Sequence, residues 1–289
     1  MIRLIPGDPA LVLLGTDVTP QQIAFERTKM GLDQPIFVQY VIWAGNMLRG
    51  DFGKSFINDF PVSQLLLKKL PATVELSIAA LLVATLLSFP LGILSALKNG
   101  KWPDRLITLY NSLAMGVPSF WLGILLILVF ALQLKWLPPS GFADIVESPA
   151  EGIKYILMPA VTLGVFISAV WARFIKSSIL ETISQDYVRT ARSKGLPQTV
   201  VITRHVLRNA MIPVITVFGL NFGSLLGGAV ITESIFDWPG VGRLLVQSLL
   251  TRDYSIVQAL IMMAVLVYLV VNLVTDLLYG VVDPRISRT

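Results

Sequence analysis

Few residues in this chain could carry out chemistry by themselves. The 289 residues include one histidine, His205, and no cysteine. Thiol catalysis, iron–sulfur clusters and disulfides therefore have no residue to use, and one histidine cannot build a histidine-rich metal site. The phosphate-binding pattern GxxxxGK[ST] is also absent from the sequence, so the chain has no nucleotide site of that kind. We expect no metal, no cofactor and no catalytic residue here.

Polar residues inside apolar runs are the next candidates. Glu75, Glu233 and Asp276 lie within or at the ends of such runs, where a charge deep in a bilayer costs at least about 3 kcal/mol on insertion scales. Glu75 and Glu233 are near a run's end, so we expect both to reach the membrane interface. Asn221 and Ser224 lie mid-run, where interhelical hydrogen bonds or contacts with a solute would explain them. The acids form no repeated ladder of the kind that proton-coupled carriers use.

The longest markedly polar interval after residue 155 runs from Asp186 to Pro213 and separates two apolar runs. It has a single acid, at its first position, and its bases are Arg189, Arg192, Lys194, Arg204 and Arg208. Gly195 can end a first short helix in a left-handed conformation, and Pro197 can begin a second. We predict a helix–glycine–helix elbow that protrudes and docks onto another molecule. A basic loop held at the lipid headgroups is the alternative.

Composition identifies a membrane protein. Hydrophobic residues make up 54% of the chain and charged residues 14%, with a mean hydropathy of +0.72, whereas a soluble domain has roughly 25% charged residues. The net charge of +5 and the pI near 9.5 could suggest a nucleic-acid partner. The bases, however, cluster in loops between apolar runs with no interleaved aromatic residues, so we expect a lipid bilayer and no nucleic acid.

Long apolar runs predict an all-α membrane protein with five visible transmembrane helices. Each run exceeds the length that a bilayer core of about 30 Å requires. The second run contains Pro118, and the third contains Pro159 near its start. The five runs cover residues 72–97, 106–134, 156–175, 211–235 and 256–282.

Loop charges predict the orientation of these helices. Bases exceed acids in the loops 98–105 and 186–209 and in the C-terminal tail, which we therefore place in the cytoplasm. The loops 135–154 and 236–255 are richer in acids and are expected outside. The segment 6–70, with helices expected at 21–30 and 37–48, is then external as well. A first helix that is cut short before residue 6 would bring the N-terminus inside and give six spans.

Two segments of the elbow resemble a known family. YVRTARSKG (187–195) and HVLRNAMIP (205–213) resemble the "EAA" loop of bacterial ABC importer permeases. The resemblance is strongest to the dipeptide, oligopeptide, nickel and glutathione branch, and it extends from Leu4 to the C-terminus. Arg189 stands where the wider family has glutamate, and His205 and Arg208 stand where isoleucine and proline are usual. These departures are typical of the peptide branch.

The resemblance implies the transmembrane domain of a type I ABC importer with six helices. Residues 1–70 would be the remnant of the first helix plus an external loop region, and residues 71–289 the permease core with a cytoplasmic coupling loop at 184–210. The chain would form half of a pathway for peptides or similar small solutes in the bacterial cytoplasmic (inner) membrane. Its expected partners are two ABC ATPase subunits, a second homologous permease and an external substrate-binding protein. It would not be an enzyme itself, because the ATPase chains hydrolyse ATP.

Site residues follow from the same resemblance. The residues expected to couple the permease to the ATPase are Tyr187, Arg189, Thr190, Ala191, Lys194, Gly195, Leu196 and Pro197. Ala191 and Gly195 would permit close approach of the ATPase. The pore or gate candidates are Asn221, Ser224, Glu233 and Trp238. Glu233 and Trp238 belong to a segment that resembles the family's re-entrant external segment, although a plain interfacial helix would also explain it.

Two other classes of protein compete with the importer. An ATP-independent secondary carrier would need no other chain, but the sequence shows neither an inverted repeat nor a carboxylate relay. An intramembrane enzyme would need a partner for His205, and none is present nearby. The substrate stays open, because relatives carry dipeptides, oligopeptides, glutathione, nickel chelates and other solutes.

Overall fold

The structure of the protein is a computed structural model, and it describes residues 18–29 and 31–282. Its regular elements in this part of the chain are helices, with one isolated bridge between Lys54 and Pro61. The α-helices are α2 (Pro20–Lys29), α3 (Ile36–Leu48), α4 (Val62–Leu97), α5 (Trp102–Gly116), α6 (Ser119–Leu126), α7 (Pro149–Ile183), α8 (Asp186–Ser193), α9 (Gln198–Val200), α10 (Arg208–Ile235), α11 (Val241–Leu250) and α12 (Tyr254–Val282). Two π-helical stretches are η2 (Ile127–Gln133) and η3 (Val201–Leu207).

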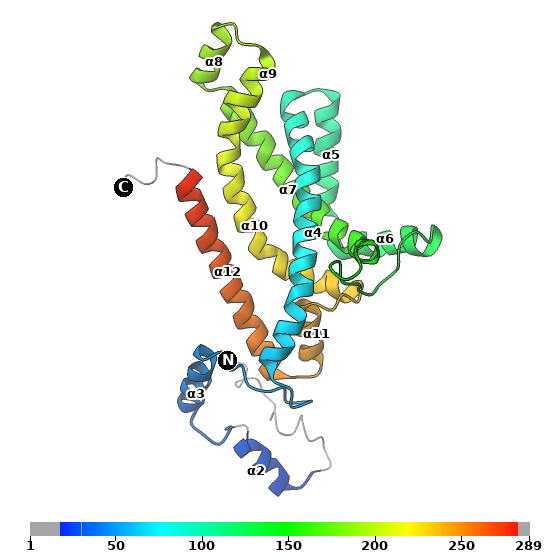
Figure 1. The fold of residues 1–289 in the computed structure, drawn as a ribbon, viewed down its shortest axis with the longest axis vertical. Helices are drawn as coiled ribbons and strands as arrows, with labels where there is room; N and C mark the ends of the chain where they lie inside the picture. Colours follow the sequence, from blue (N-terminus) through cyan, green and yellow to red (C-terminus); the bar gives the residue numbers. More distant parts are fainter. Residues whose placement is uncertain (1–17, 30, 283–289) are drawn as a thin grey trace.

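The long helices α4, α7, α10 and α12 run along the length of the molecule (Figure 1). Helices α8 and α9 lie beyond one end of this bundle, and α2 and α3 lie beyond the other. Within the described residues, α4, α7 and α12 are each long and apolar enough to cross a membrane, and a fourth span is added if α5 and α6–η2 count as one broken helix. This layout is typical of a multi-pass membrane protein.

Helices α4 and α7 pack closely because α4 presents small residues at every fourth position. Ala80, Ala84, Ser88, Gly92 and Ala96 are all buried. Spacing by four puts them on one face of the helix. A Cβ atom at Gly92 would lie 2.7 Å from the Ile175 Cβ atom on α7, which is too near for any side chain. Small residues therefore let the two helix backbones approach, as is common in membranes.

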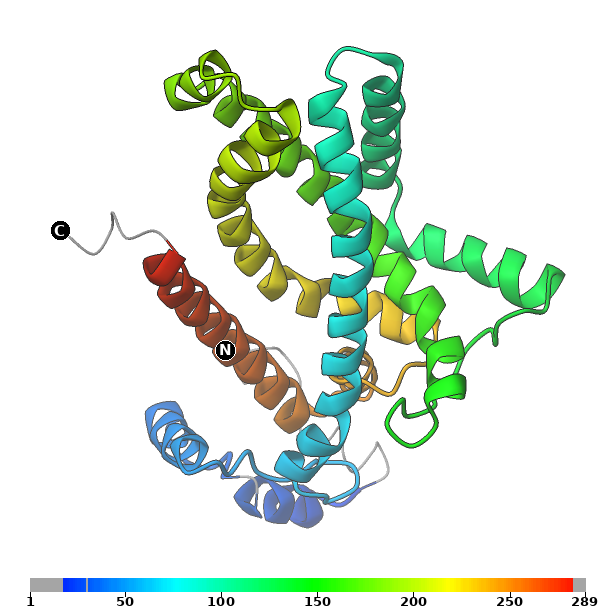
Figure 2. The ribbon, with the colours of Figure 1, turned by 45° about the horizontal axis from the view of Figure 1, so that its top comes forward.

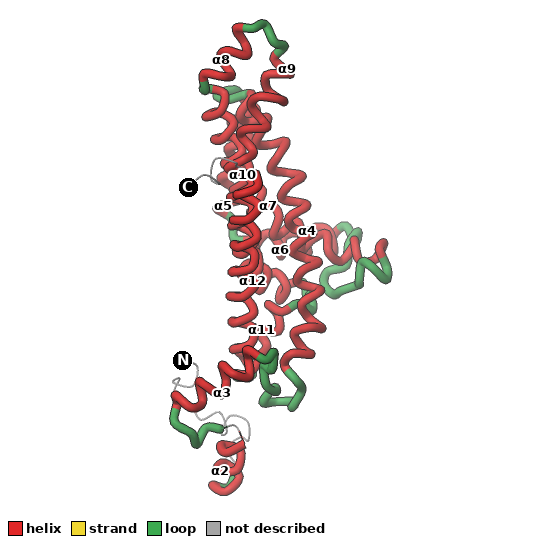
Figure 3. Tube along the Cα trace, turned by 60° about the vertical axis from the view of Figure 1, so that its left-hand side comes forward, coloured by secondary structure: helices red, strands yellow, loops and turns green. Residues whose placement is uncertain are grey.

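The span expected over residues 106–134 is not one straight helix. Helix α5 ends at Gly116, α6 begins at Ser119, and the two axes differ by 100°. Proline disfavours the helical conformation in the residue before it, and Val117 is indeed extended, with φ −86° and ψ 126°. Figures 2 and 3 show α6 projecting sideways from the bundle. The break at Pro118 therefore redirects the chain.

The two helices expected before the first long span are present as α2 and α3. The start of α2 is a capping box. The Gln22 backbone N–H donates to the Thr19 Oγ1 atom at 3.4 Å, and the Thr19 N–H donates to the Gln22 Oε1 atom at 3.0 Å. Helix α4 begins at Val62, ahead of the domain boundary expected at residue 70, and it continues through Pro71. The remnant of a first helix expected before residue 6 falls outside the described residues.

Candidate functional site

The elbow, residues 184–210, has the predicted helix–glycine–helix form. Helix α8 ends at Ser193, and Gly195 follows with φ +74°, a left-handed conformation that favours glycine. The second helical piece begins at Gln198, so Pro197 precedes it instead of starting it. This piece continues as η3 into α10. In Figure 1 the elbow caps the end of the bundle where α7 finishes and α10 starts.

Buried side chains fix the elbow to the bundle. Val188 and Ala191 on α8 pack with Val201, Val206 and Ala210 from η3 and α10 in one apolar cluster. Ala191 thus faces the interior, in contrast to its expected place at a partner surface, because it lies on the apolar side of α8.

A polar contact adds to this anchoring. The Asn209 Nδ2 atom donates to the Tyr187 hydroxyl at 3.1 Å and to the His205 carbonyl oxygen at 2.9 Å. The α8 helix is therefore tied to the base of α10 on both its apolar and its polar side.

The outer face of the elbow is basic around an apolar tip. Arg189, Arg192 and Lys194 are exposed, and none of them forms an ion pair with a described residue. Leu196 is 38% exposed at the tip, and a Cβ atom at Gly195 would meet nothing within 4 Å. Thr190 and Pro197 are also exposed. Such a surface is complementary to an acidic partner with an apolar pocket.

Glu233 was expected to reach the membrane interface, and the structure instead shows its carboxylate buried within the protein, at the first turn of α11. The Glu233 Oε1 atom accepts from the Thr73 hydroxyl at 2.6 Å, and the Oε2 atom accepts from the Arg243 backbone N–H at 2.9 Å. The first N–H groups of a helix lack partners within the helix and favour a negative charge. Glu233 therefore fixes α11 to the end of α10.

Trp238 is buried in the turn between α10 and α11. Its Nε1 atom donates to the Ala72 carbonyl oxygen on α4 at 2.8 Å, and the ring meets Phe142 edge-on with centroids 4.8 Å apart. Thr73 completes the joint, since its hydroxyl also accepts from the Val241 N–H at 2.8 Å. Sequence reasoning missed Thr73, whose only signal was a polar residue at the start of an apolar run.

The pore or gate residues are thus only partly described. Glu233 and Trp238 are closed off from solvent, so a gating role would require α11 to move, and it stays a prediction. Asn221 and Ser224 are on α10, but their side chains lie outside the described part of the structure. No group of three acidic or histidine side chains suited to a metal occurs among the described residues.

Comparison with known families decides the class of protein. The family described as "Binding-protein-dependent transport system inner membrane component" matches residues 88–288, and a model of the N-terminal part of such membrane components matches residues 1–77. This chain belongs to that family. It is the transmembrane subunit of an ATP-driven importer. It is an inner-membrane component, and its described part contains three helices that are long and apolar enough to cross a membrane.

Curated relatives agree over nearly the whole length. The chain is 41% identical over 285 residues to the glutathione transport system permease protein GsiC of Salmonella typhimurium strain LT2, covering 99% of this chain and 90% of the relative. The corresponding GsiC of Escherichia coli strain K12 is 40% identical with the same coverage. The predicted assignment to the peptide and glutathione branch is confirmed, and the secondary carrier is not favoured.

Solved structures support the fold. One structure of the MetNI methionine ABC transporter, in an inward-facing conformation, matches with a TM-score of 0.62 at 14% identity and covers 76% of this chain and 97% of its own. A structure described as an amino acid ABC transporter with histidines matches with a TM-score of 0.55 at 17% identity, covering 77% of this chain and 94% of its own. The predicted type I importer fold is confirmed.

Proposed function

We propose that this permease is driven by separate ATPase chains that dock on the elbow, and that the elbow faces the cytoplasm. The observation that carries the proposal is the basic outer face of the elbow. Arg189, Arg192 and Lys194 are exposed near the exposed Leu196, and none of the three bases forms an ion pair with a described residue. An acidic groove on an ATPase would neutralise these bases and cover the apolar tip. Gly195 and Pro197 set the backbone conformation of the tip, and the hydrogen bond between Tyr187 and Asn209 orients α8.

Anchoring of the elbow would convert docking into movement of the spans. Because Val188 packs with Val201 and Val206, α8 and the start of α10 form one small rigid unit. Closure of the ATPases around ATP would displace this unit and carry α7 and α10 with it. Such rigid-body rocking would switch the pathway from inward-open to outward-open. ATP hydrolysis would belong entirely to the docked chains.

The complete importer would contain two ATPase subunits, a second homologous permease and an external binding protein. The solute would be glutathione or another small peptide-like molecule, in keeping with the name of the GsiC relatives. Uptake of labelled glutathione and of a labelled dipeptide by cells with and without the chain would distinguish these solutes. Uptake that persists after ATP depletion would instead favour the secondary carrier.

Substitution at the elbow tip tests the docking. Gly195→Trp should lower uptake at least about ten-fold while the protein still inserts, because the open space around Gly195 leaves the indole free to block the partner surface. Gly195→Asn is the matched control, since asparagine tolerates the left-handed conformation and adds little bulk. Normal uptake by the tryptophan variant at normal expression would refute the docking proposal.

A further inference from the structure

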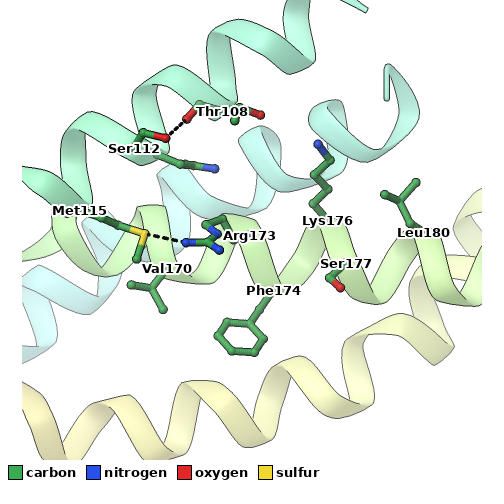
Figure 4. A pocket seen from close by; sticks show the side chains of 10 residues that line it. Thr108, Ser112, Met115, Val170, Arg173, Phe174, Lys176, Ser177 and Leu180 are labelled. Carbon is green, nitrogen blue, oxygen red and sulfur yellow. Dashed lines mark hydrogen bonds between the residues drawn. The ribbon is translucent and has the colours of Figure 1, made fainter. Parts of the chain in front are cut away.

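A cleft lies between α5 and α7, separate from the elbow and from the α11 joint. Its volume is about 740 Å³, and Figure 4 shows the facing sides of the two helices that line it. Most of its wall is apolar, from Met115 on α5 and from Val170, Phe174 and Leu180 on α7. A cation, Arg173, lies among these apolar residues of α7. An occupant must therefore suit both an apolar surface and a positive charge.

Arg173 keeps an uncompensated charge. It has no carboxylate within ion-pair distance among the described residues, and its Nη1 atom donates to the Met115 sulfur at 3.4 Å. Sulfur is a weak acceptor, so this contact does not neutralise the guanidinium. The other cation of the cleft, Lys176, is held by the buried carboxylate of Asp104. The cleft therefore carries a net positive charge at Arg173.

The ion pair between Lys176 and Asp104 places Arg173 near the membrane surface. Asp104 lies in the first turn of α5, which begins at Trp102, so Lys176 is level with the start of α5. Arg173 is three residues deeper in the bundle, about 4.5 Å along the axis of α7. Trp102 is 72% exposed, and tryptophans are enriched at the level of the lipid headgroups. A long basic side chain at this depth reaches the phosphates of the adjacent leaflet.

Further bases continue the cleft toward that surface. Arg105 precedes the cleft residue Thr108 by three positions, which places both on one side of α5, and Lys101 directly precedes the helix. Both bases are exposed, and neither forms an ion pair with a described residue. On the facing end of α7 the exposed acid is Glu181. The bases therefore outnumber the acid, and the local field favours an anion.

The apolar part of the site extends in the opposite direction, toward the middle of the bundle. Val170 and Met115 lie on the deeper side of Arg173. Beyond them, a second and almost wholly apolar hollow of about 210 Å³ lies between α5, α6 and α7, where the exposed side chains of Leu113 and Phe166 help to line it. Bases at one end and apolar hollows at the other match the two parts of an anionic phospholipid.

We propose that the cleft between α5 and α7 binds an anionic phospholipid, with its phosphate on Arg173 and its acyl chains against Val170 and Met115. A free phosphate would leave the apolar wall uncovered, and a zwitterionic lipid would bring a cation of its own to a site already rich in bases. The bound lipid contacts α7, which continues into the elbow, so it influences the movement of the spans. Only this role in transport, and the placement of the lipid in the cytoplasmic leaflet, rest on the proposed function.

Quenching by brominated lipids tests this selectivity in the assembled transporter. The chain has no cysteine, so Ser177→Cys allows one bimane fluorophore to be attached to this subunit in the cleft, and the signal of the parent transporter is subtracted as background. The vesicles contain equal amounts of phosphatidylglycerol and phosphatidylcholine, and only one of the two lipids carries bromine on its acyl chains. We expect brominated phosphatidylglycerol to quench at least about two-fold more than brominated phosphatidylcholine, because each base attracts the anionic headgroup.

Substitutions at Arg173 assign the preference to the cleft. Arg173→Gln should bring the two quenching values close together. Arg173→Lys retains the charge and should retain most of the difference. Arg252→Gln is the matched control and should leave the preference unchanged, because Arg252 is an exposed base in the turn between α11 and α12, at the opposite end of the bundle.

The other outcomes would overturn the proposal. Equal quenching by the two lipids in the Ser177→Cys transporter would show that the cleft does not select an anionic lipid. Absence of quenching by either lipid would mean that protein or water fills the cleft. A preference that survives Arg173→Gln would place the anionic lipid elsewhere. ATP-driven uptake into the same vesicles is measured in parallel, so a failed lipid site and a failed importer are distinguishable.

Discussion

The hydroxyl of Thr73 donates to the carboxylate of Glu233 at 2.6 Å and joins the start of α4 to the end of α10. The same hydroxyl accepts from the N–H of Val241, the first residue of α11, and the carboxylate accepts from the backbone N–H of Arg243, two residues later. Three helices thus meet at one buried polar joint. Because the polar groups of this joint form hydrogen bonds with one another, removing one group leaves its partners unsatisfied.

Loss of the Glu233 carboxylate should destabilise the α11 joint. Glu233→Ala leaves the Thr73 hydroxyl and the Arg243 N–H without an acceptor, at a cost of about 1–3 kcal/mol for each buried group. Glu233→Gln retains the shape and one acceptor, so its effect should be smaller. The apparent melting temperature of the purified transporter measures both. Equal melting temperatures for the parent and the alanine variant would contradict a stabilising role of Glu233 in the joint.

Gly240→Ala should prevent normal closure of the same joint. A Cβ atom there would overlap the carboxylate of Glu233, so either the turn or Glu233 must move. We expect a strongly reduced yield of folded protein in gel filtration. Gly45→Ala is the matched control in α3, where a Cβ atom meets nothing within 4 Å and alanine favours the helix. A normal yield for Gly240→Ala would show that the turn is not tightly packed.

Two acid–lysine pairs among the described residues should differ in their importance for stability. Asp104 is buried and holds Lys176, Ser95 and the Gly100 N–H, so Asp104→Asn should cost about 1–3 kcal/mol. Glu151 pairs with Lys154 at 2.7 Å, but both side chains are about half exposed. Glu151→Gln should therefore change stability by about 0–1 kcal/mol. Thermal unfolding of the two variants side by side checks this prediction. Asp104→Asn must lower the stability more than Glu151→Gln does.

The apolar tip of the elbow should be needed for energy coupling. Leu196→Glu puts a negative charge on the exposed tip, where an acidic ATPase surface would repel it. We expect ATPase activity stimulated by the loaded binding protein to fall about ten-fold, with normal insertion. Leu196→Met keeps the apolar character and should retain most activity. Full stimulation in the glutamate variant would mean that the tip does not contact the ATPase.

Sequence reasoning predicted the elbow well because its signals are local. Gly195, followed closely by Pro197 between two short helical segments, determines where one helix ends and the next begins. The helix expected over residues 21–30 is present as α2, Pro20–Lys29. The class of protein also followed from composition and from the motifs at 187–195 and 205–213.

The failures came where the outcome depends on distant parts of the chain. Burial of Glu233 depends on Thr73, 160 residues away, and on the turn at Gly240. The bend at Pro118 was foreseeable from the proline itself, yet its angle depends on packing. The stripe of small residues from Ala80 to Ala96 was not singled out from the sequence, and its partner α7 could not be chosen from spacing alone. Ala191 was assigned to a partner surface, although its side of α8 is the apolar one.

Site-specific crosslinking tests the central claim most directly. Ser193→Cys places a thiol on the exposed side of the elbow, and Ser140→Cys places one in the exposed loop between η2 and α7; the chain has no other thiol. A photoactivatable maleimide is attached in native membranes, and the crosslinked chains are identified by mass spectrometry. We predict an ATPase adduct from position 193 and none from position 140. An ATPase adduct from position 140 alone, or no ATPase adduct from position 193 in an actively importing membrane, would contradict the account.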